Sequence, residues 1–350
     1  MPVGGAAPSE PPDVRAERPA PLPDSGMPTQ SLGSTGLRVS RLGLGLAALG
    51  RPAYINLGRS EDFGHQRSVA DLQRRCHDML DAAYAAGCRY VDAARSYGMA
   101  EAFLGTWLSD RKLPADAITI GSKWGYTYVA GWQLDASIHE VKDLSVATLR
   151  RQIAESRALL GGRLHLYQIH SATVESGVLD DVAVLRELHE LRSGGLVIGL
   201  TVTGPKQAEV IRRALRTTVD GRNPFQVVQA TWNLLEVSAG PALADAKAEG
   251  WGVIIKEALA NGRLTDRAEG EHLPGLKTEA VARGTTVDAL ALAAALSQPW
   301  ADVVLSGAVS AEQLTSNLKS IGLAREGVDW LALAEPAADY WGHRSALAWQ

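Results

Sequence analysis

The sequence contains little cysteine, little net charge and no long apolar run. Its 350 residues include two cysteines, Cys76 and Cys88, which indicate neither a disulfide framework nor a metal site and fit a reducing, cytoplasmic setting. A net charge of −4 gives no general attraction to nucleic acid or to an anionic membrane. Because no run approaches about 20 apolar residues, we expect no membrane span. The oligomeric state stays open.

Residues 1–29 are rich in proline and alanine and lack the charged start and apolar stretch of a signal peptide. A segment of this composition buries little apolar surface, so we expect it to be disordered. The chain as a whole is 46% hydrophobic and 21% charged, which is ordinary for a globular protein. We assign residues 30–350 to a single domain.

From residue 32 onward, short apolar runs alternate with stretches that repeat apolar residues about every 3.6 positions. The expected strands are 39–46, 88–92, 118–123, 164–170, 196–202, 225–231, 252–256 and 302–306. The expected helices are 69–86, 99–109, 144–160, 178–192, 206–215, 239–249, 287–297 and 311–321. Eight strands that each precede a helix predict an α/β fold, the (β/α)8 TIM barrel. Residues 32–38, with a turn at 34–36, predict a short N-terminal β-hairpin ahead of it.

One motif points to a different fold. Residues 43–48 read Gly-Leu-Gly-Leu-Ala-Ala, which matches the dinucleotide fingerprint of a Rossmann domain. That fingerprint needs a helix that begins within it and an acidic residue that ends a second strand about 20 positions later. Here a polar loop follows, and the next helical pattern begins near Val69. We therefore favour the barrel, in which these glycines let the first strand pass close to a ligand.

Four side chains follow strand-like runs at the ends that a parallel barrel brings to one mouth: Asp92, Tyr97, Lys123 and His170. A phenol with an ordinary pKa of about 10 is a poor proton shuttle near neutrality. A lysine cation beside it stabilises the phenolate, and a carboxylate holds that lysine charged and in place. The set predicts acid/base chemistry on an alcohol oxygen.

Each of the four also has an ordinary structural explanation. Asp92 could cap a helix, Tyr97 could be a half-buried surface aromatic, and Lys123 could be solvated. His170 could be a packed strand residue, so the catalytic interpretation rests on the four occurring together. We assign no metal, because His165 and His170 lie five apart on one strand and face opposite sides.

With these motifs, residues 32–323 resemble the aldo-keto reductase family. Residues 32–45 resemble its first hairpin and strand, and the four residues above fall on its catalytic tetrad. Residues 229–235 and 306–318 resemble its cofactor motifs at the sixth strand and after the eighth. The resemblance implies NAD(P)H bound extended across the barrel mouth without a Rossmann fold. It also implies hydride transfer between nicotinamide and a small-molecule carbonyl or alcohol substrate.

The resemblance further implies a role for each site residue. Tyr97 would exchange the proton, Lys123 would lower the pKa of Tyr97, Asp92 would anchor Lys123, and His170 would orient the substrate. The residues expected to contact the cofactor are Thr201, Gln229, Trp232, Ala258, Leu259, Ser306, Gly307, Ser310, Gln313 and Asn317.

Several positions depart from the family pattern. Val202 stands where an Asn usually holds the carboxamide, and Trp232 stands for the usual stacking Tyr. Residues 257–259 read Glu-Ala-Leu in place of Ser-Pro-Leu, and the carboxylate would repel the pyrophosphate unless Lys256 neutralises it.

The cofactor is NADP or NAD. No lysine or arginine occurs between Ser306 and Asn317, where members that prefer NADPH place a cation for the 2′-phosphate. Ser310 could donate one hydrogen bond. Without a cation, discrimination in favour of the phosphate should be weak.

Two loops are expected to select the substrate. Residues 124–132 carry four aromatic side chains, and residues 51–65 form a second long loop over the mouth. Unless the loops only pack on each other, aromatic faces with polar groups between them suit a sugar slightly better than a polyketide or terpenoid ketone. The alternative function is an NAD(P)H-binding regulatory sensor with little turnover, against which an intact tetrad argues.

Overall fold

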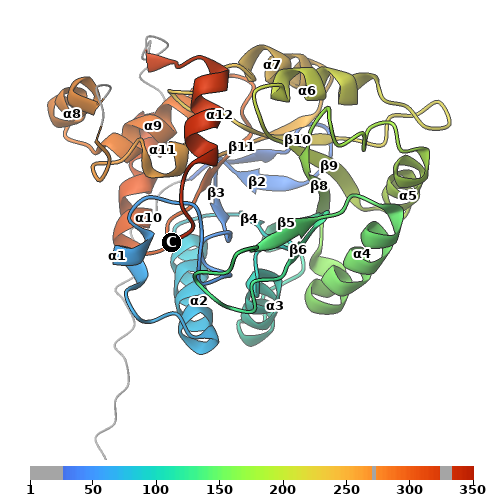
Figure 1. Ribbon diagram of the computed structural model, residues 1–350, viewed down its shortest axis with the longest axis horizontal. Helices are drawn as coiled ribbons and strands as arrows, with labels where there is room; N and C mark the ends of the chain where they lie inside the picture. The colour runs from blue at the N-terminus through green and yellow to red at the C-terminus, as the bar shows by residue number, and fades with distance from the viewer. Residues whose placement is uncertain (1–26, 270–272, 324–332) are drawn as a thin grey trace, which may run out of the picture.

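The computed structural model describes residues 27–269, 273–323 and 333–350, which form a closed barrel of eight parallel strands with helices around it (Figure 1). In spatial order the strands are β10, β11, β12, β3, β4, β5, β8 and β9, and β9 pairs with β10 again. Their bounds are β3 (Leu42–Gly45), β4 (Tyr90–Asp92), β5 (Thr119–Trp124), β8 (Leu166–Ala172), β9 (Val197–Val202), β10 (Val227–Thr231), β11 (Gly252–Lys256) and β12 (Val303–Ser306). The predicted TIM barrel is confirmed.

A helix follows each barrel strand, as predicted, with small shifts at the ends. These helices are α2 (Val69–Ala85), α3 (Ala100–Asp110), α4 (Val146–Leu160), α5 (Val182–Ser193), α6 (Gln207–Arg216), α7 (Gly240–Ala248), α9 (Val287–Leu296) and α10 (Ala311–Leu318). The hydroxyl of Ser68 caps α2 by accepting from the Asp71 backbone, and Asp181 caps α5 in the same way. Because Asp181 is a cap, α5 begins later than its apolar pattern indicated.

Several elements lie outside the predicted repeat. They are the helices α1 (Arg59–Phe63), α8 (Leu273–Ala282), α11 (Ser320–Leu323) and α12 (Ala337–Ser345), the 3-10 turns Gly161–Arg163 and Ala260–Gly262, and the hairpin of β6 (Tyr126–Tyr128) with β7 (Glu140–Lys142). None of the helices in the described part of the chain combines the length and the apolar character that a membrane crossing needs.

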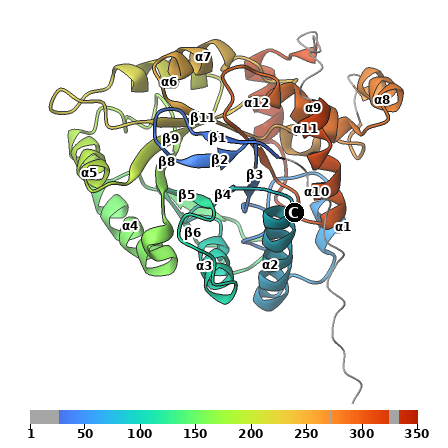
Figure 2. The same ribbon diagram turned by 180° about the vertical axis from the view of Figure 1, so that it is seen from behind.

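The N-terminal hairpin is also present. It pairs β1 (Thr29–Ser31) with β2 (Arg38–Ser40) and lies across one end of the barrel (Figure 2). Leu32 and Val39 pack there against barrel residues such as Tyr90. The single strand predicted over 39–46 is therefore two strands, because β2 belongs to the hairpin. Of the segment predicted to be disordered, residues 1–26 lie outside the described residues, and Thr29 begins β1.

Alternation along the strands decides what the barrel presents at its other end. The layer next to the hairpin is apolar and includes Tyr90, Val227 and Ile254. Two residues further along the same strands, Asp92, Gln229 and Lys256 face the same way and are polar. The barrel therefore has an apolar floor and a polar mouth, and α12 and the C-terminus cross the mouth in Figure 1.

Candidate active site

A cavity of about 680 Å³ opens at the barrel mouth. Asp92, Tyr97 and His170 line one part of it, while Gln313 and Asn317 of α10 line another. We call these parts the catalytic end and the far end. A volume of this size is typical of a site for a small molecule or cofactor.

The four predicted catalytic residues lie together at the catalytic end. Lys123 forms an ion pair with Asp92, and both side chains are buried. The Lys123 ammonium also donates to the hydroxyl of Tyr97 at 3.4 Å and to the Ala93 carbonyl at 2.9 Å. Lys123 therefore links the carboxylate to the phenol, as the sequence predicted.

Asp92 is held by more than its lysine. The Tyr90 hydroxyl donates to it at 3.1 Å, and the Gln229 amide donates to it at 2.8 Å. Gln229 was predicted to contact the cofactor. It lines the cavity, but its amide nitrogen is engaged by Asp92.

Tyr97 keeps its proton in this environment. Burial, and then the charge of Asp92, raise the pKa of Tyr97 well above its ordinary value of 10. The net direction is opposite to the lowering of the pKa expected from Lys123, because burial and the charge of Asp92 dominate. The phenol is therefore a proton donor that Lys123 can stabilise once the proton has left.

His170 lies edge-on to Tyr97, with 5.5 Å between ring centroids, and also contacts Tyr126. Its Nδ1 lies 3.4 Å from the Ser96 hydroxyl. Burial and the charge of Lys123 lower the pKa of His170 well below its ordinary value. The imidazole is neutral near pH 7 and can donate one N–H to a substrate oxygen.

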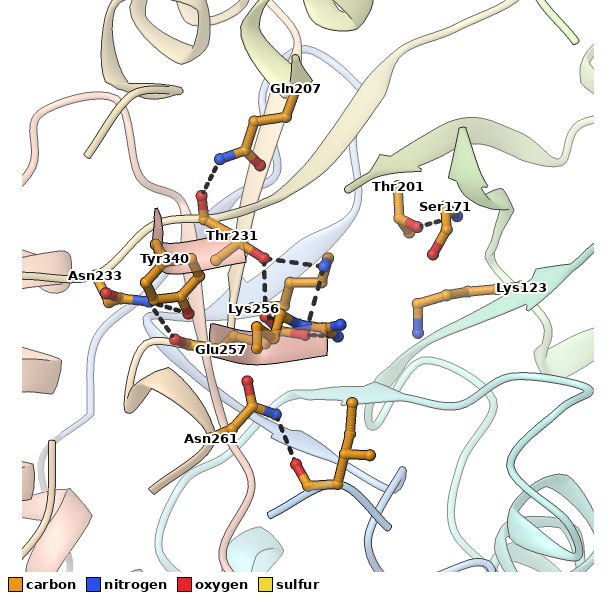
Figure 3. A network of polar contacts seen from close by, with 12 residues as sticks. Lys123, Ser171, Thr201, Gln207, Thr231, Asn233, Lys256, Glu257, Asn261 and Tyr340 are labelled. Carbon is orange, nitrogen blue, oxygen red and sulfur yellow. Dashed lines mark hydrogen bonds and ion pairs between the residues drawn. The ribbon is translucent and has the colours of Figure 1, made fainter. Parts of the chain in front are cut away.

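A bulge at the end of β8 places this histidine. The pairing of β8 with β9 shifts register between Ile169 and Ala172, and Ser171 has φ 58°. The Ser171 backbone donates at 2.7 Å to the hydroxyl of Thr201, as Figure 3 shows. Bulges next to active sites re-aim side chains. Thr201, predicted to contact cofactor, instead fixes this bulge, and Ser171 lines the cavity in its place.

Most of the other predicted cofactor residues line the cavity. They are Ala258, Leu259, Ser306, Gly307, Gln313 and Asn317. Trp232 and Ser310, which were also predicted to contact the cofactor, do not line the cavity. Trp232 is buried and lies edge-on to Trp300, with 5.6 Å between their ring centroids. Ser310 caps α10 by accepting from the Gln313 backbone at 3.3 Å. The Trp232 ring packs against Trp300, and Trp232 is not among the residues that line the cavity.

Glu257 has a partner that the sequence did not indicate. Arg344 of α12 donates to both of its carboxylate oxygens, at 2.8 and 2.5 Å, whereas the Lys256 ammonium lies 3.7 Å away. Burial alone would raise the pKa of Glu257, but Arg344 and then Lys256 outweigh it and lower the pKa to about 2. The charge of Glu257 is therefore neutralised mainly by Arg344 and less by Lys256.

Two further groups cover the catalytic end. Arg51, on the loop after β3, donates to Glu140 at 2.9 Å and lies over the rings of Tyr97 and Trp349. At the C-terminus, Gln350 exchanges two backbone hydrogen bonds with Tyr54, of 3.0 and 3.1 Å. The loop and the C-terminal tail therefore meet over the cavity. The predicted role of residues 51–65 as a covering loop agrees with this placement.

The loop after β5 contributes less than its four aromatic residues indicated. Tyr126 lines the cavity. Trp124 is fully buried, and Trp132 donates through its indole to the Arg67 carbonyl at 2.7 Å. Trp349 of the C-terminal tail lines the cavity as well. No pattern in the sequence connected this terminal tryptophan with the mouth.

The far end of the cavity is acidic. Asp62, from α1, accepts from the Gln313 amide at 2.9 Å and pairs with Arg267 at 2.7 Å. Three more carboxylates line this part of the cavity: Asp266, Asp288 and Glu312. The sequence singled out none of these carboxylates, although Asp62 lies in the predicted covering loop and Glu312 in the segment that resembles a cofactor motif.

Gly50 fixes the backbone beside the proton donor. A Cβ atom at this position would lie 2.2 Å from the Tyr97 carbonyl oxygen, well inside contact distance. The Met99 backbone donates to the Gly50 carbonyl at 2.7 Å. Only glycine allows the loop after β3 to pack this closely against the loop that carries Tyr97.

The site suits an extended dinucleotide. The cavity joins the tetrad to α10, and a Cβ built at Gly307 meets no atom within 4 Å, so ligand can approach the backbone there. Glu312 and Gln313, from the first turn of α10, line the same cavity.

A sequence model described as Aldo/keto reductase family matches residues 41–326 of this chain. The NADH-specific methylglyoxal reductase of Escherichia coli (strain K12) is 24% identical over 337 residues, which cover 87% of this chain and 97% of that protein. The L-galactose dehydrogenase of Arabidopsis thaliana is 25% identical over 325 residues, which cover 88% of this chain and 93% of that protein. An aldo-keto reductase from Bacillus halodurans, solved in its holo form, superposes with a TM-score of 0.63 at 21% identity and covers 92% of this chain and 96% of its own.

Proposed function

The chain belongs to the aldo/keto reductase family of oxidoreductases, and we propose that it interconverts a small carbonyl compound and its alcohol with Tyr97 as the proton donor. The observation that carries this proposal is the linked set of Asp92, Lys123 and Tyr97 in a cavity that also reaches α10. A nicotinamide cofactor, which this family uses, supplies the hydride when bound.

The protein's own groups handle the proton. Tyr97 is protonated at neutral pH and can donate to the oxygen of a carbonyl. Lys123, ion-paired with Asp92, stabilises the phenolate that results. The neutral His170 donates an N–H to the same oxygen and so orients the substrate. In the oxidative direction the same groups accept the proton.

Seven of the predicted residues line the cavity and would hold the cofactor. They are Gln229, Ala258, Leu259, Ser306, Gly307, Gln313 and Asn317. We assign the preference to NAD over NADP, because Asp62 bonds to Gln313 at the end where the adenosine would lie. A 2′-phosphate there would meet a carboxylate and three acidic neighbours. The NADH-specific relative is consistent with this assignment.

The substrate we propose is a small aldehyde, ketone or sugar. Tyr126 and Trp349 offer aromatic faces beside the polar groups of the catalytic end. The names of the relatives include methylglyoxal and L-galactose, which are small polar carbonyl compounds or sugars.

Replacing Tyr97 by Phe tests the proposal, since only the hydroxyl is lost. Turnover across a panel of aldehydes and sugars should fall by roughly two or more decades, while NADH still quenches the protein fluorescence with an unchanged Kd. Tyr84→Phe is the matched control, because Tyr84 packs on Trp107 outside the cavity. If the wild-type protein bound NADH but turned over no compound in the panel, the proposed oxidoreductase activity would be wrong. That result would favour the NAD(P)H-binding regulatory sensor.

A further inference from the structure

Lys256 is a second lysine at the barrel mouth. It lies two residues beyond Ile254 of the apolar floor and therefore points inward from β11. Its ammonium donates to the Thr231 hydroxyl at 3.0 Å, and the residue lines the cavity. Figure 3 shows Lys256 and Lys123 reaching into the mouth from different strands.

The charges around Lys256 do not balance. Three other cations of the catalytic end have a carboxylate each: Arg51 pairs with Glu140, Lys123 with Asp92, and Arg344 with Glu257. Lys256 shares Glu257 with Arg344, and its ammonium lies 3.7 Å from that carboxylate, whereas Arg344 donates at 2.8 and 2.5 Å. Among the groups named here, the catalytic end therefore holds four cations and three carboxylates.

A buried cation without its own counter-ion is costly, so this arrangement needs a reason. The Lys256 side chain is 16% exposed, and burial lowers its pKa to about 8, which still leaves most of the ammonium charged near pH 7. The site would be completed by an anionic group that enters the cavity.

We propose that Lys256 binds a carboxylate on the substrate, so that the enzyme acts on carbonyl compounds or sugars that carry an acid group. This inference rests on the proposed oxidoreductase function and assigns Lys256 as its specificity-determining residue. Thr231 positions the ammonium, and the Glu257–Arg344 pair leaves it available to the ligand.

Substrate pairs that differ in one group test the inference. D-glucuronate and D-glucose differ by a carboxylate in place of a hydroxymethyl group, as do 4-carboxybenzaldehyde and 4-(hydroxymethyl)benzaldehyde. Wild type should favour the acid of each pair in kcat/KM by about ten- to a hundredfold, the range for a charge-assisted contact. Lys256→Met should lose that preference, whereas Lys256→Arg should retain it.

A binding measurement removes the dependence on turnover. By calorimetry, benzoate should bind wild type about ten- to a hundredfold more tightly than benzamide, and Lys256→Met should abolish the difference. Lys206→Met is the matched control, because Lys206 is exposed and pairs with Glu175 at the surface.

The outcomes separate the inference from the function on which it rests. Turnover of neutral substrates without a preference for acids, together with equal binding of benzoate and benzamide, would overturn the inference alone. If Lys256→Met weakened NADH binding and slowed both members of each pair equally, Lys256 would contact the cofactor pyrophosphate and the inference would be wrong. If the wild-type protein turned over no substrate at all, the proposed function itself would instead be wrong.

Discussion

The two ends of the cavity are built in different ways and carry opposite charge. At the catalytic end, Asp92, Lys123 and Lys256 project from strand positions that face into the barrel. At the far end, Asp62 and Arg267 come from segments outside the barrel strands. Among the groups named above, the first holds four cations and three carboxylates, and the second holds one cation and four carboxylates.

This difference separates two tasks. Strand positions are fixed by many backbone hydrogen bonds, which suits groups that must stay within hydrogen-bonding distance of a reacting oxygen. Loop positions can change without disturbing the barrel, which suits groups that select among related ligands. We therefore expect substitutions at the catalytic end to alter rate and stability, and substitutions at the far end to alter the choice of cofactor.

The largest effect should come from the centre of the catalytic end. In Lys123→Met the phenolate of Tyr97 loses the cation that stabilises it, so kcat should fall by roughly 10²–10⁴-fold. Steady-state kinetics against the Lys206→Met control would measure this, with circular dichroism to check folding. A variant that kept its rate would show that Lys123 has no part in catalysis. The proposed division of tasks between the catalytic end and the far end would then be wrong.

The next effect concerns the ion pair between the mouth and α12. Arg344→Met leaves Glu257 buried without its closest cation, so the free energy of unfolding should fall by roughly 2–3 kcal/mol. Urea denaturation at pH 7 would measure it. The control is Arg150→Met, whose exposed pair with Glu187 should contribute about 1 kcal/mol or less.

The same pair predicts how stability depends on pH. The pKa of Glu257 is about 2 in the fold, below its ordinary 4.5, so its ionised form is stabilised by folding. This contribution, on the order of 3 kcal/mol, is fully present above about pH 5 and is lost as the pH falls toward 2. The gap in unfolding free energy between wild type and Arg344→Met should therefore narrow over that range. A gap independent of pH would assign the loss to packing.

The smallest effect should come from the far end. Asp62→Asn removes a carboxylate beside the expected adenosine site and releases Arg267 from its ion pair. Affinity for NADPH relative to NADH should rise about tenfold, or 1.4 kcal/mol, and less at high salt. Fluorescence quenching would measure both cofactors, with Asp245→Asn as the control because Asp245 pairs with Arg212 at the surface. Wild type that already favours NADPH would show that the far end does not repel phosphate.

The sequence was most informative where the barrel repeats. The alternation of apolar runs located all eight barrel strands, and strand ends placed Asp92, Lys123 and His170 at one mouth. Tyr97 could be added because it lies five residues after Asp92, on the connection to α3. Local patterns were sufficient here, since each residue's position follows from its own strand.

Contacts between distant segments could not be predicted from the sequence. Arg344 meets Glu257 from 87 positions away, and Gln313 meets Asp62 from 251 positions away. Trp232 shows the same limit, because its contact with Trp300 and its absence from the cavity lining have no signature in the local sequence. The β8 bulge, which gives Thr201 and Ser171 their roles, also has no signature in the local pattern.

Gly50 has a consequence for how this sequence can change over generations. The residue does not line the cavity, yet any side chain there would push on the Tyr97 carbonyl. In a library randomised at every position and selected for turnover, position 50 should be as depleted of variants as the tetrad itself. A survey of tolerated mutations would then mark as essential a residue that performs no chemistry, because the proton donor's geometry depends on the absence of one methyl group.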